Sequence, residues 1–76
     1  MVPRMADIPY RYKIRVKLPD KSSRDEDMTV SESNSAFGSA MAMGKVVRYY
    51  DSLMAYREIL DYWITVKDLR QFLFLD

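Results

Sequence analysis

The sequence predicts a single α+β domain, in which a small antiparallel sheet packs against one principal helix, with room for a second short helix. Three patterns predict this fold: strict alternation over residues 10–18, helical spacing from Ala36 onward, and a run of β-forming residues over 60–66. A chain of 76 residues suits one domain. We expect residues 1–8 to form a flexible N-terminal segment and residues 9–76 to form the domain.

The first strand is predicted by an unbroken period of two over residues 10–18. Pro9 and Pro19 flank this run, and proline at the end of a strand stops the hydrogen-bonded ladder from extending. One side of the strand is apolar and the other is basic. The apolar side consists of Tyr10, Tyr12, Ile14, Val16 and Leu18, and the basic side of Arg11, Lys13, Arg15 and Lys17.

A polar loop is predicted to follow this strand. Residues 20–27 are charged or polar without periodicity, and residues 21–24 are the expected tip. Residues 28–30 are predicted to form a short second strand that returns antiparallel to the first. Residues 31–34 then supply several candidate helix N-caps, with Glu32 close to the positive end of the helix that follows.

The helical spacing that begins at Ala36 predicts one apolar face. The small residues on that face would allow close approach to a sheet or to another helix, whereas Gly44 could instead cap the C-terminus of the helix. The face consists of Ala36, Phe37, Ala40, Met41 and Gly44.

Residues 45–66 fit two patterns. Apolar residues recur at steps of three and four up to Trp63, but residues 60–66 also alternate and are rich in β-formers. We predict a helix to Ile59 and a strand over 60–66, and a second helix that runs through Trp63 is the competing interpretation. A capping pattern at Thr65 could start a short terminal helix. Residues 72–75 are apolar and should pack on the core or on a partner.

The residue types that are missing argue against an enzyme. The chain has no His, the usual group for proton transfer near neutral pH, and no Cys, the usual thiolate nucleophile or metal ligand. Residues 25–27 are acidic but lack the spacing of a calcium loop, and neither 37–39 nor 43–45 fits a phosphate-binding loop. We therefore expect no catalytic residues, no cofactor and no metal.

No apolar run approaches the roughly 20 residues of a membrane span, and residues 1–7 do not resemble a signal peptide. We expect a cytoplasmic protein that does not bind membranes. Charge is uneven along the chain. Residues 1–24 hold seven basic and two acidic groups, a net charge of +5, and residues 25–32 hold four acidic groups, a net charge of −4.

The predicted basic strand face is the main candidate contact surface. Alternate residues of a strand lie about 6.6 Å apart, a spacing that suits phosphates or an acidic protein surface. A solvated sheet face, or an edge strand protected by charge, is the alternative. Tyr, Trp, Met and Arg are enriched at protein interfaces, and the chain has six Tyr, six Met and one Trp. The predicted partner-binding residues are Arg11, Lys13, Arg15, Lys17, Tyr10, Tyr12, Tyr50 and Tyr62.

These observations favour a non-enzymatic regulator or inhibitor that binds a protein with an acidic surface. In size and composition the chain is similar to small phage-encoded proteins that dock on a host machine, such as RNA polymerase or a CRISPR effector, and block it. Two alternatives stay open. One is a nucleic-acid-binding module that uses the basic strand, and the other is a structural homo-oligomer joined through residues 72–75.

Overall fold

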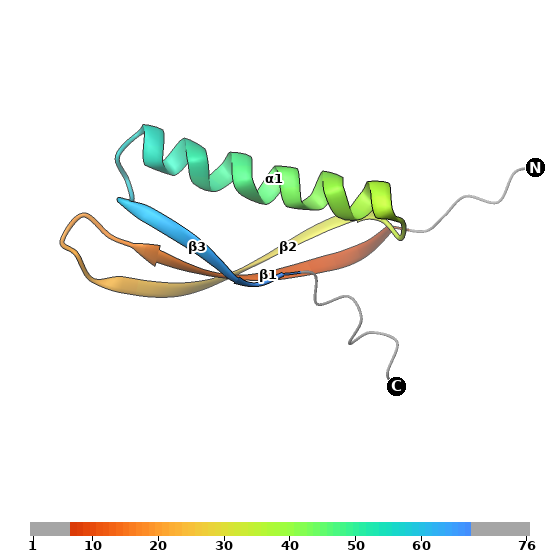
Figure 1. The fold of residues 1–76 in the computed structure, drawn as a ribbon, viewed down its shortest axis with the longest axis horizontal. Coiled ribbons are helices and arrows are strands. Elements are labelled where there is room, and N and C mark those ends of the chain that lie inside the picture. Colours follow the sequence, from red (N-terminus) through yellow and green to blue (C-terminus); the bar gives the residue numbers. More distant parts are fainter. Residues whose placement is uncertain (1–6, 68–76) are drawn as a thin grey trace, which may run out of the picture.

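A central strand organises the sheet. The computed structural model describes residues 7–67, which form β1 (Asp7–Lys17), β2 (Ser23–Ser33), α1 (Ala36–Ala55) and β3 (Asp61–Val66) in chain order. The strand order is β2-β1-β3, and β1 is antiparallel to both neighbours. α1 lies across one face of this sheet (Figure 1). The predicted α+β fold, a small antiparallel sheet with one principal helix, is confirmed.

The β1–β2 hairpin is longer than the sequence predicted. β2 has 11 residues and pairs with β1 along its whole length, from Lys17 opposite Ser23 to Asp7 opposite Ser33. The predicted loop over 20–27 is therefore wrong, because most of it belongs to β2. Acidic residues that lack local periodicity can form a strand when the neighbouring strand places basic groups opposite them, and β1 does so.

The hairpin turn itself is tight. The Lys21 N–H donates to the Leu18 carbonyl at 2.8 Å, and Pro19 occupies the position after Leu18 that its fixed φ favours. Lys21 has φ of 73°, in the left-handed region. The Asp20 carboxylate accepts from both the N–H and the hydroxyl of Ser22, which lowers the pKa of Asp20.

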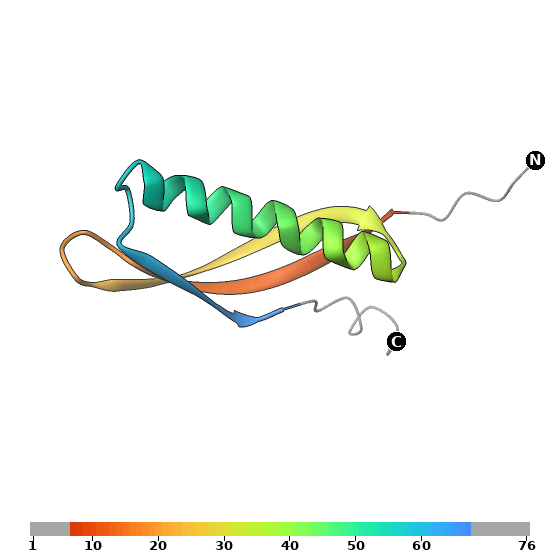
Figure 2. The same ribbon diagram turned by 45° about the horizontal axis from the view of Figure 1, so that its top comes forward.

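Pro9 does not end β1, as the sequence suggested, because the strand begins two residues earlier at Asp7. Odd-numbered residues of β1 direct their backbone groups toward β3, as the bond from the Leu60 N–H to the Lys17 carbonyl shows. β3 pairs with β1 only between Lys17 and Lys13. Figure 2 shows that β3 is shorter than β1. The missing N–H of Pro9 therefore faces a part of the edge that no described strand occupies, where proline is tolerated.

The N-cap of α1 is Ser35, one residue after the predicted caps, and the helix begins at Ala36. The Ser35 hydroxyl accepts the Gly38 N–H at 2.9 Å, and the helix continues without interruption through Gly44. The predicted apolar face is wrong: Phe37 is 73% exposed and Met41 is 38% exposed. The side that faces the sheet is the adjacent row of Gly38, Ala42, Val46 and Tyr50.

The core lies between this row and the inner side of β1. Every second residue of β1 from Tyr10 to Val16 is at most 1% exposed, and partly buried side chains, among them Ile8 of β1 and residues of β2 and β3, surround them. The helix approaches closely where its first turn meets the end of β2, because a Cβ on Gly38 would lie 1.9 Å from the Ser33 carbonyl oxygen. The buried core consists of Tyr10, Tyr12, Ile14, Val16, Ala42, Val46, Tyr50 and Ile59.

α1 ends in a left-handed turn that sends the chain back to β1. The Arg57 N–H donates to the Met54 carbonyl and the Glu58 N–H to the Leu53 carbonyl, the two bonds of a Schellman motif. Arg57 has φ of 61°, a conformation that usually favours glycine. The strand β3 that follows confirms the predicted strand over 60–66, apart from its first residue. The competing helix through Trp63 is wrong.

Two predictions lie outside the described residues, the packing of residues 72–75 and the greater part of the flexible segment 1–8. Thr65 and Val66 belong to β3, so the predicted short terminal helix does not include these two residues. Within residues 7–67, no helix has the length and apolar character needed to cross a membrane.

Gly38→Ala should destabilise the fold by about 3 kcal/mol, because the added methyl group cannot fit against the Ser33 backbone without displacing the helix. Gly44→Ala is the matched control. Its Cβ would meet only the end of the Arg48 side chain at 3.8 Å, so it should stabilise the helix by about 0.5–1 kcal/mol. Urea unfolding followed by circular dichroism measures the unfolding free energy of both variants. Equal effects of the same sign would contradict the close packing of Gly38 against Ser33.

Arg57→Gly should stabilise the protein by about 1 kcal/mol, because glycine adopts the left-handed conformation without the steric cost of a Cβ. Arg57→Ala keeps the Cβ and should leave the unfolding free energy nearly unchanged. Thermal unfolding of the two variants tests this, and a loss of stability in the glycine variant would show that the Arg57 side chain matters more than its backbone.

Candidate functional site

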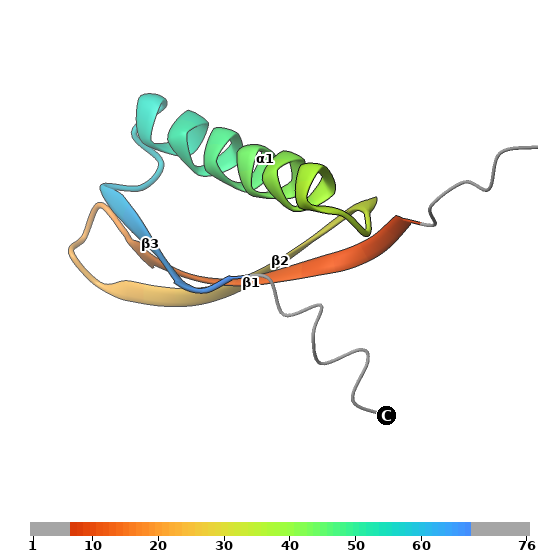
Figure 3. The same ribbon diagram turned by 45° about the vertical axis from the view of Figure 1, so that its right-hand side comes forward.

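The face of the sheet opposite α1 carries no covering element among residues 7–67 (Figure 3). We call it the open face. It is formed by side chains that point away from the helix, at odd-numbered positions of β1 and β2 and at the residues of β3 paired with them. Its charged and aromatic members are Asp7, Arg11, Lys13, Arg15, Lys17, Asp25, Asp27, Asp61 and Trp63.

The open face places the four predicted basic residues in one column along β1. Arg11, Lys13 and Arg15 are exposed, and Lys17 is half-buried. This confirms the predicted alternation, in which basic side chains point one way and apolar side chains the other. Since β1 is the central strand, however, side chains of both neighbouring strands flank this column.

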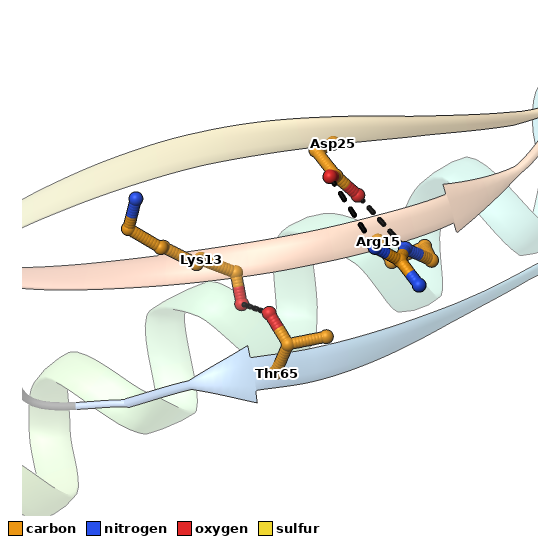
Figure 4. Close-up of polar contacts among 4 residues, drawn as sticks. All are labelled: Lys13, Arg15, Asp25 and Thr65. Atoms are coloured by element: carbon orange, nitrogen blue, oxygen red, sulfur yellow. Dashed lines mark hydrogen bonds and ion pairs between the residues drawn. The ribbon is translucent and has the colours of Figure 1, made fainter.

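An acidic column on β2 lies beside the basic column. Arg15 donates from Nε to the Asp25 Oδ1 at 2.9 Å and from Nη2 to Oδ2 at 3.4 Å (Figure 4). The hydrogen bond from Arg15 lowers the pKa of Asp25, and the nearby charges of Arg15 and Lys13 add to this effect. The same pair raises the pKa of Arg15. Because both side chains are more than half exposed, this ion pair orients the side chains rather than stabilising the fold strongly.

Three further positions complete the charge pattern. Lys13 is opposite Asp27, and Lys17 is opposite Asp61 on β3. Arg11 is opposite Thr29 on β2 and has no partner on β3, so no acidic residue of either neighbouring strand lies directly across from it. The basic residues therefore belong to a surface of alternating charge, and not to the isolated basic stripe that the strand alone suggested.

Trp63 adds an aromatic element to this surface. It lies directly opposite Arg15 on β3 and is 48% exposed. A β-bulge after the next pair, Ile14 and Ile64, places Val66 opposite Lys13. The Thr65 hydroxyl donates to the Lys13 carbonyl at 3.1 Å (Figure 4). Sequence reasoning did not select Trp63 as a contact residue. The alternation of residues 60–66 was the signal, because Tyr62 and Ile64 pack inward and Trp63 must then point outward.

The predicted aromatic contact residues lie elsewhere. Tyr10, Tyr12 and Tyr50 are at most 1% exposed and form the core, so they cannot contact a partner in this fold. This corrects the prediction for those three residues. Their rings are buried because β1 is central and α1 covers its inner side. Tyr62 is half-buried on the same inner side, next to Tyr50.

Tyr50 and Tyr62 instead join α1 to both edge strands. Their rings stack with centroids 5.2 Å apart. The Tyr50 hydroxyl donates to Glu26 of β2 at 2.9 Å, and the Tyr62 hydroxyl donates to Asp51 of α1 at 2.8 Å. Burial and the bond to Glu26 raise the pKa of Tyr50 well above its ordinary value. Burial and the bond to Asp51 raise the pKa of Tyr62 to about 12.

The part of the chain between residues 7 and 67 contains no group of three His, Cys, Asp or Glu side chains arranged to hold a metal ion, and it encloses no pocket. Comparison with known proteins adds no relative: the chain matches no protein family, no curated protein and no solved structure. The functional argument therefore rests on the open face itself.

The stability of the protein should fall as the pH rises from 10 to 12. In the unfolded chain tyrosine ionises near pH 10, whereas folded Tyr50 and Tyr62 keep their protons longer, so unfolding releases protons in this range. Below pH 10 the contribution of these two tyrosines to the stability of the fold is fully present. Tyr62→Phe and Asp51→Asn should each make the fall shallower in urea unfolding. An unchanged slope in both variants would contradict the contact between Asp51 and Tyr62.

Proposed function

We propose that this protein is a non-enzymatic regulator or inhibitor that binds a protein partner through the open face of its sheet. The observation that carries this proposal is the half-exposed Trp63, which lies in one cross-strand row with Arg15 and Asp25. Tryptophan and arginine are the side chains that most often dominate binding energy at protein interfaces. Leaving an indole ring half in water is costly, and a partner that covers it would recover this cost.

The charge pattern suggests the chemistry of the partner. A complementary surface would offer carboxylates to Arg11 and Lys13, and basic groups to Asp25 and Asp27. Alternating charges of this kind favour one orientation of the partner and disfavour surfaces of a single sign. They also make a nucleic-acid backbone a poorer match than a protein, because the acidic column would lie close to its phosphates.

The residue composition supports a binding role over a catalytic one. The chain contains neither imidazole nor thiol. The carboxylates of the open face lie opposite basic or polar residues on an exposed sheet, where water is not excluded. Catalysis by carboxylates usually depends on burial that shifts their pKa upward, and the pKa of Asp25 is shifted downward.

Arg11→Glu and Trp63→Ala should each reduce capture of the partner at least tenfold, when the tagged protein is used to purify binding proteins from its cells of origin. Arg11 is the better position for charge reversal, because changing Arg15 would also break its ion pair with Asp25. Arg48→Glu is the matched control. It makes the same charge change at an exposed position on α1.

Circular dichroism should show that all three variants fold. Equal capture by the wild type and by both open-face variants would exclude this surface. Binding of a single-stranded DNA or RNA oligonucleotide in place of a protein, with affinity that falls steeply between 50 and 200 mM salt, would favour the nucleic-acid alternative.

A further inference from the structure

The outer edge of β2 is a second candidate surface. β2 is an edge strand, and none of residues 7–67 pairs with its outer side. It extends for 11 residues and contains neither proline nor glycine. Natural edge strands are usually short, bulged or interrupted by proline, because an unpaired ladder of N–H and C=O groups readily pairs with another strand. A long regular edge is therefore a site where a further strand can bind.

The backbone groups on this edge can be assigned from the hairpin. Even-numbered residues of β1 direct their backbone toward β2, so their even-numbered partners on β2 direct theirs toward β1. The odd-numbered residues of β2 therefore direct their N–H and C=O groups outward. Those in the middle of the strand are Asp25, Asp27, Thr29 and Ser31.

A row of exposed apolar side chains lies on the side of α1 that is turned toward β2. Lys45 forms an ion pair with Glu32 of β2, which places its side of the helix toward β2. Phe37, Met41 and Tyr49 lie one or two helical turns from Lys45 on the same row, at spacings of four residues. They are 73%, 38% and 50% exposed. We call these three residues the helix ridge.

The acidic residues of β2 do not prevent two such edges from meeting, because each has a cation of its own chain nearby. Glu26 pairs with Arg24 at 2.8 Å, Glu32 pairs with Lys45, and Asp25 pairs with Arg15. Asp27 lies opposite Lys13 in the β1–β2 register. The charges are thus largely balanced within one chain.

We propose that a second copy of this chain binds at the β2 edge, with the two β2 strands antiparallel and related by a two-fold axis at Met28. Met28 is the midpoint of Ser23–Ser33, so this register pairs all 11 residues of each strand. It places Asp27 opposite the second copy's Thr29 and Arg24 opposite the second copy's Glu32. No residue faces a like charge.

Neighbouring registers are less favourable. An axis at residue 27 places Asp27 opposite its own copy, and an axis at residue 29 places Glu26 opposite the second copy's Glu32. Like charges directly opposite one another destabilise a strand pair. The axis at Met28 therefore combines the greatest overlap with the best charge arrangement.

The same pairing covers the helix ridge. The buried row of α1 packs on the apolar side of β1 and its first turn contacts the end of β2, so α1 lies over the β1–β2 pair. Its copy would lie about two strand spacings away, roughly 10 Å, which is a normal distance for packed helices. The two ridges would then meet over a continuous six-stranded sheet. The open face stays uncovered in this dimer, so the dimer does not depend on the proposed partner.

Cysteine substitution tests the register directly, because the chain has no other cysteine. Met28→Cys should form a disulfide-linked dimer under mild oxidation, since the axis brings the two copies of residue 28 opposite each other. Val30→Cys is the matched control on the same side of β2. Its two copies would lie about 13 Å apart and could not be bridged. Equal cross-linking of both variants, or none at residue 28, would overturn the proposal.

Charge changes at Thr29 give an independent test by sedimentation. Thr29→Lys would face the second copy's Asp27 at two symmetric places and should tighten the dimer about five- to tenfold, and Thr29→Glu should weaken it by a similar factor. The effects of these two variants on the stability of one chain have the opposite sign. Thr29 lies opposite Arg11, so glutamate at this position would stabilise the monomer and lysine would destabilise it. The dimerisation constant therefore separates pairing of two chains from stability of one.

The helix ridge is tested in the same way. Met41→Glu should weaken the dimer at least tenfold. Ala40→Glu is the neighbouring control, at an exposed position off the ridge, and it should have little effect. A wild-type protein that stays monomeric at millimolar concentration, or a dimer that is indifferent to residues 29 and 41, would overturn the proposal.

Discussion

The packing of α1 on the β1–β2 hairpin, closest at the end of β2, is the constraint on which the rest of the structure depends. Small residues at Gly38 and Ala42 let the helix begin in contact with the end of β2, where the Ser33 carbonyl also accepts the Tyr10 hydroxyl at 2.5 Å. A chain of this size buries a smaller fraction of its surface than larger domains do, so each contact in its core carries more of the stability. The Tyr50–Tyr62 stack then fixes β3 at the other end of the helix.

The central position of β1 explains both faces of the sheet. Its apolar side lies under α1, and its basic side lies between β2 and β3, whose acidic and aromatic residues fall opposite it. The long β1–β2 hairpin therefore supplies both the apolar side of the core and the charged residues of the proposed contact surface. The acidic residues that neutralise the basic column also provide the cross-strand pairing that lets a polar segment form a regular strand.

The two proposed surfaces are separate and compatible. The open face uses side chains that point away from α1, whereas pairing of two β2 strands uses backbone groups in the plane of the sheet and apolar residues of the helix ridge. A dimer of this kind would present two open faces on the same side of one sheet. It would also bury Phe37 and Tyr49, whose exposure in one chain the core does not explain.

The sequence by itself determined the alternation of β1, the presence of one principal helix, and the strand around Trp63, because these depend on local periodicity and on intrinsic preference. The tertiary structure decided which row of helical residues faces the sheet. The row that begins at Phe37 and the row that begins at Gly38 are adjacent on the helix, and the close approach of the helix to Ser33 requires the glycine row to face the sheet. It also decided the length of β2 and the environment of the basic residues. Both depend on pairing between segments that are distant in the sequence, which a local pattern cannot predict. A charged residue joins a strand or a neutral surface only when a residue of opposite charge is placed across from it.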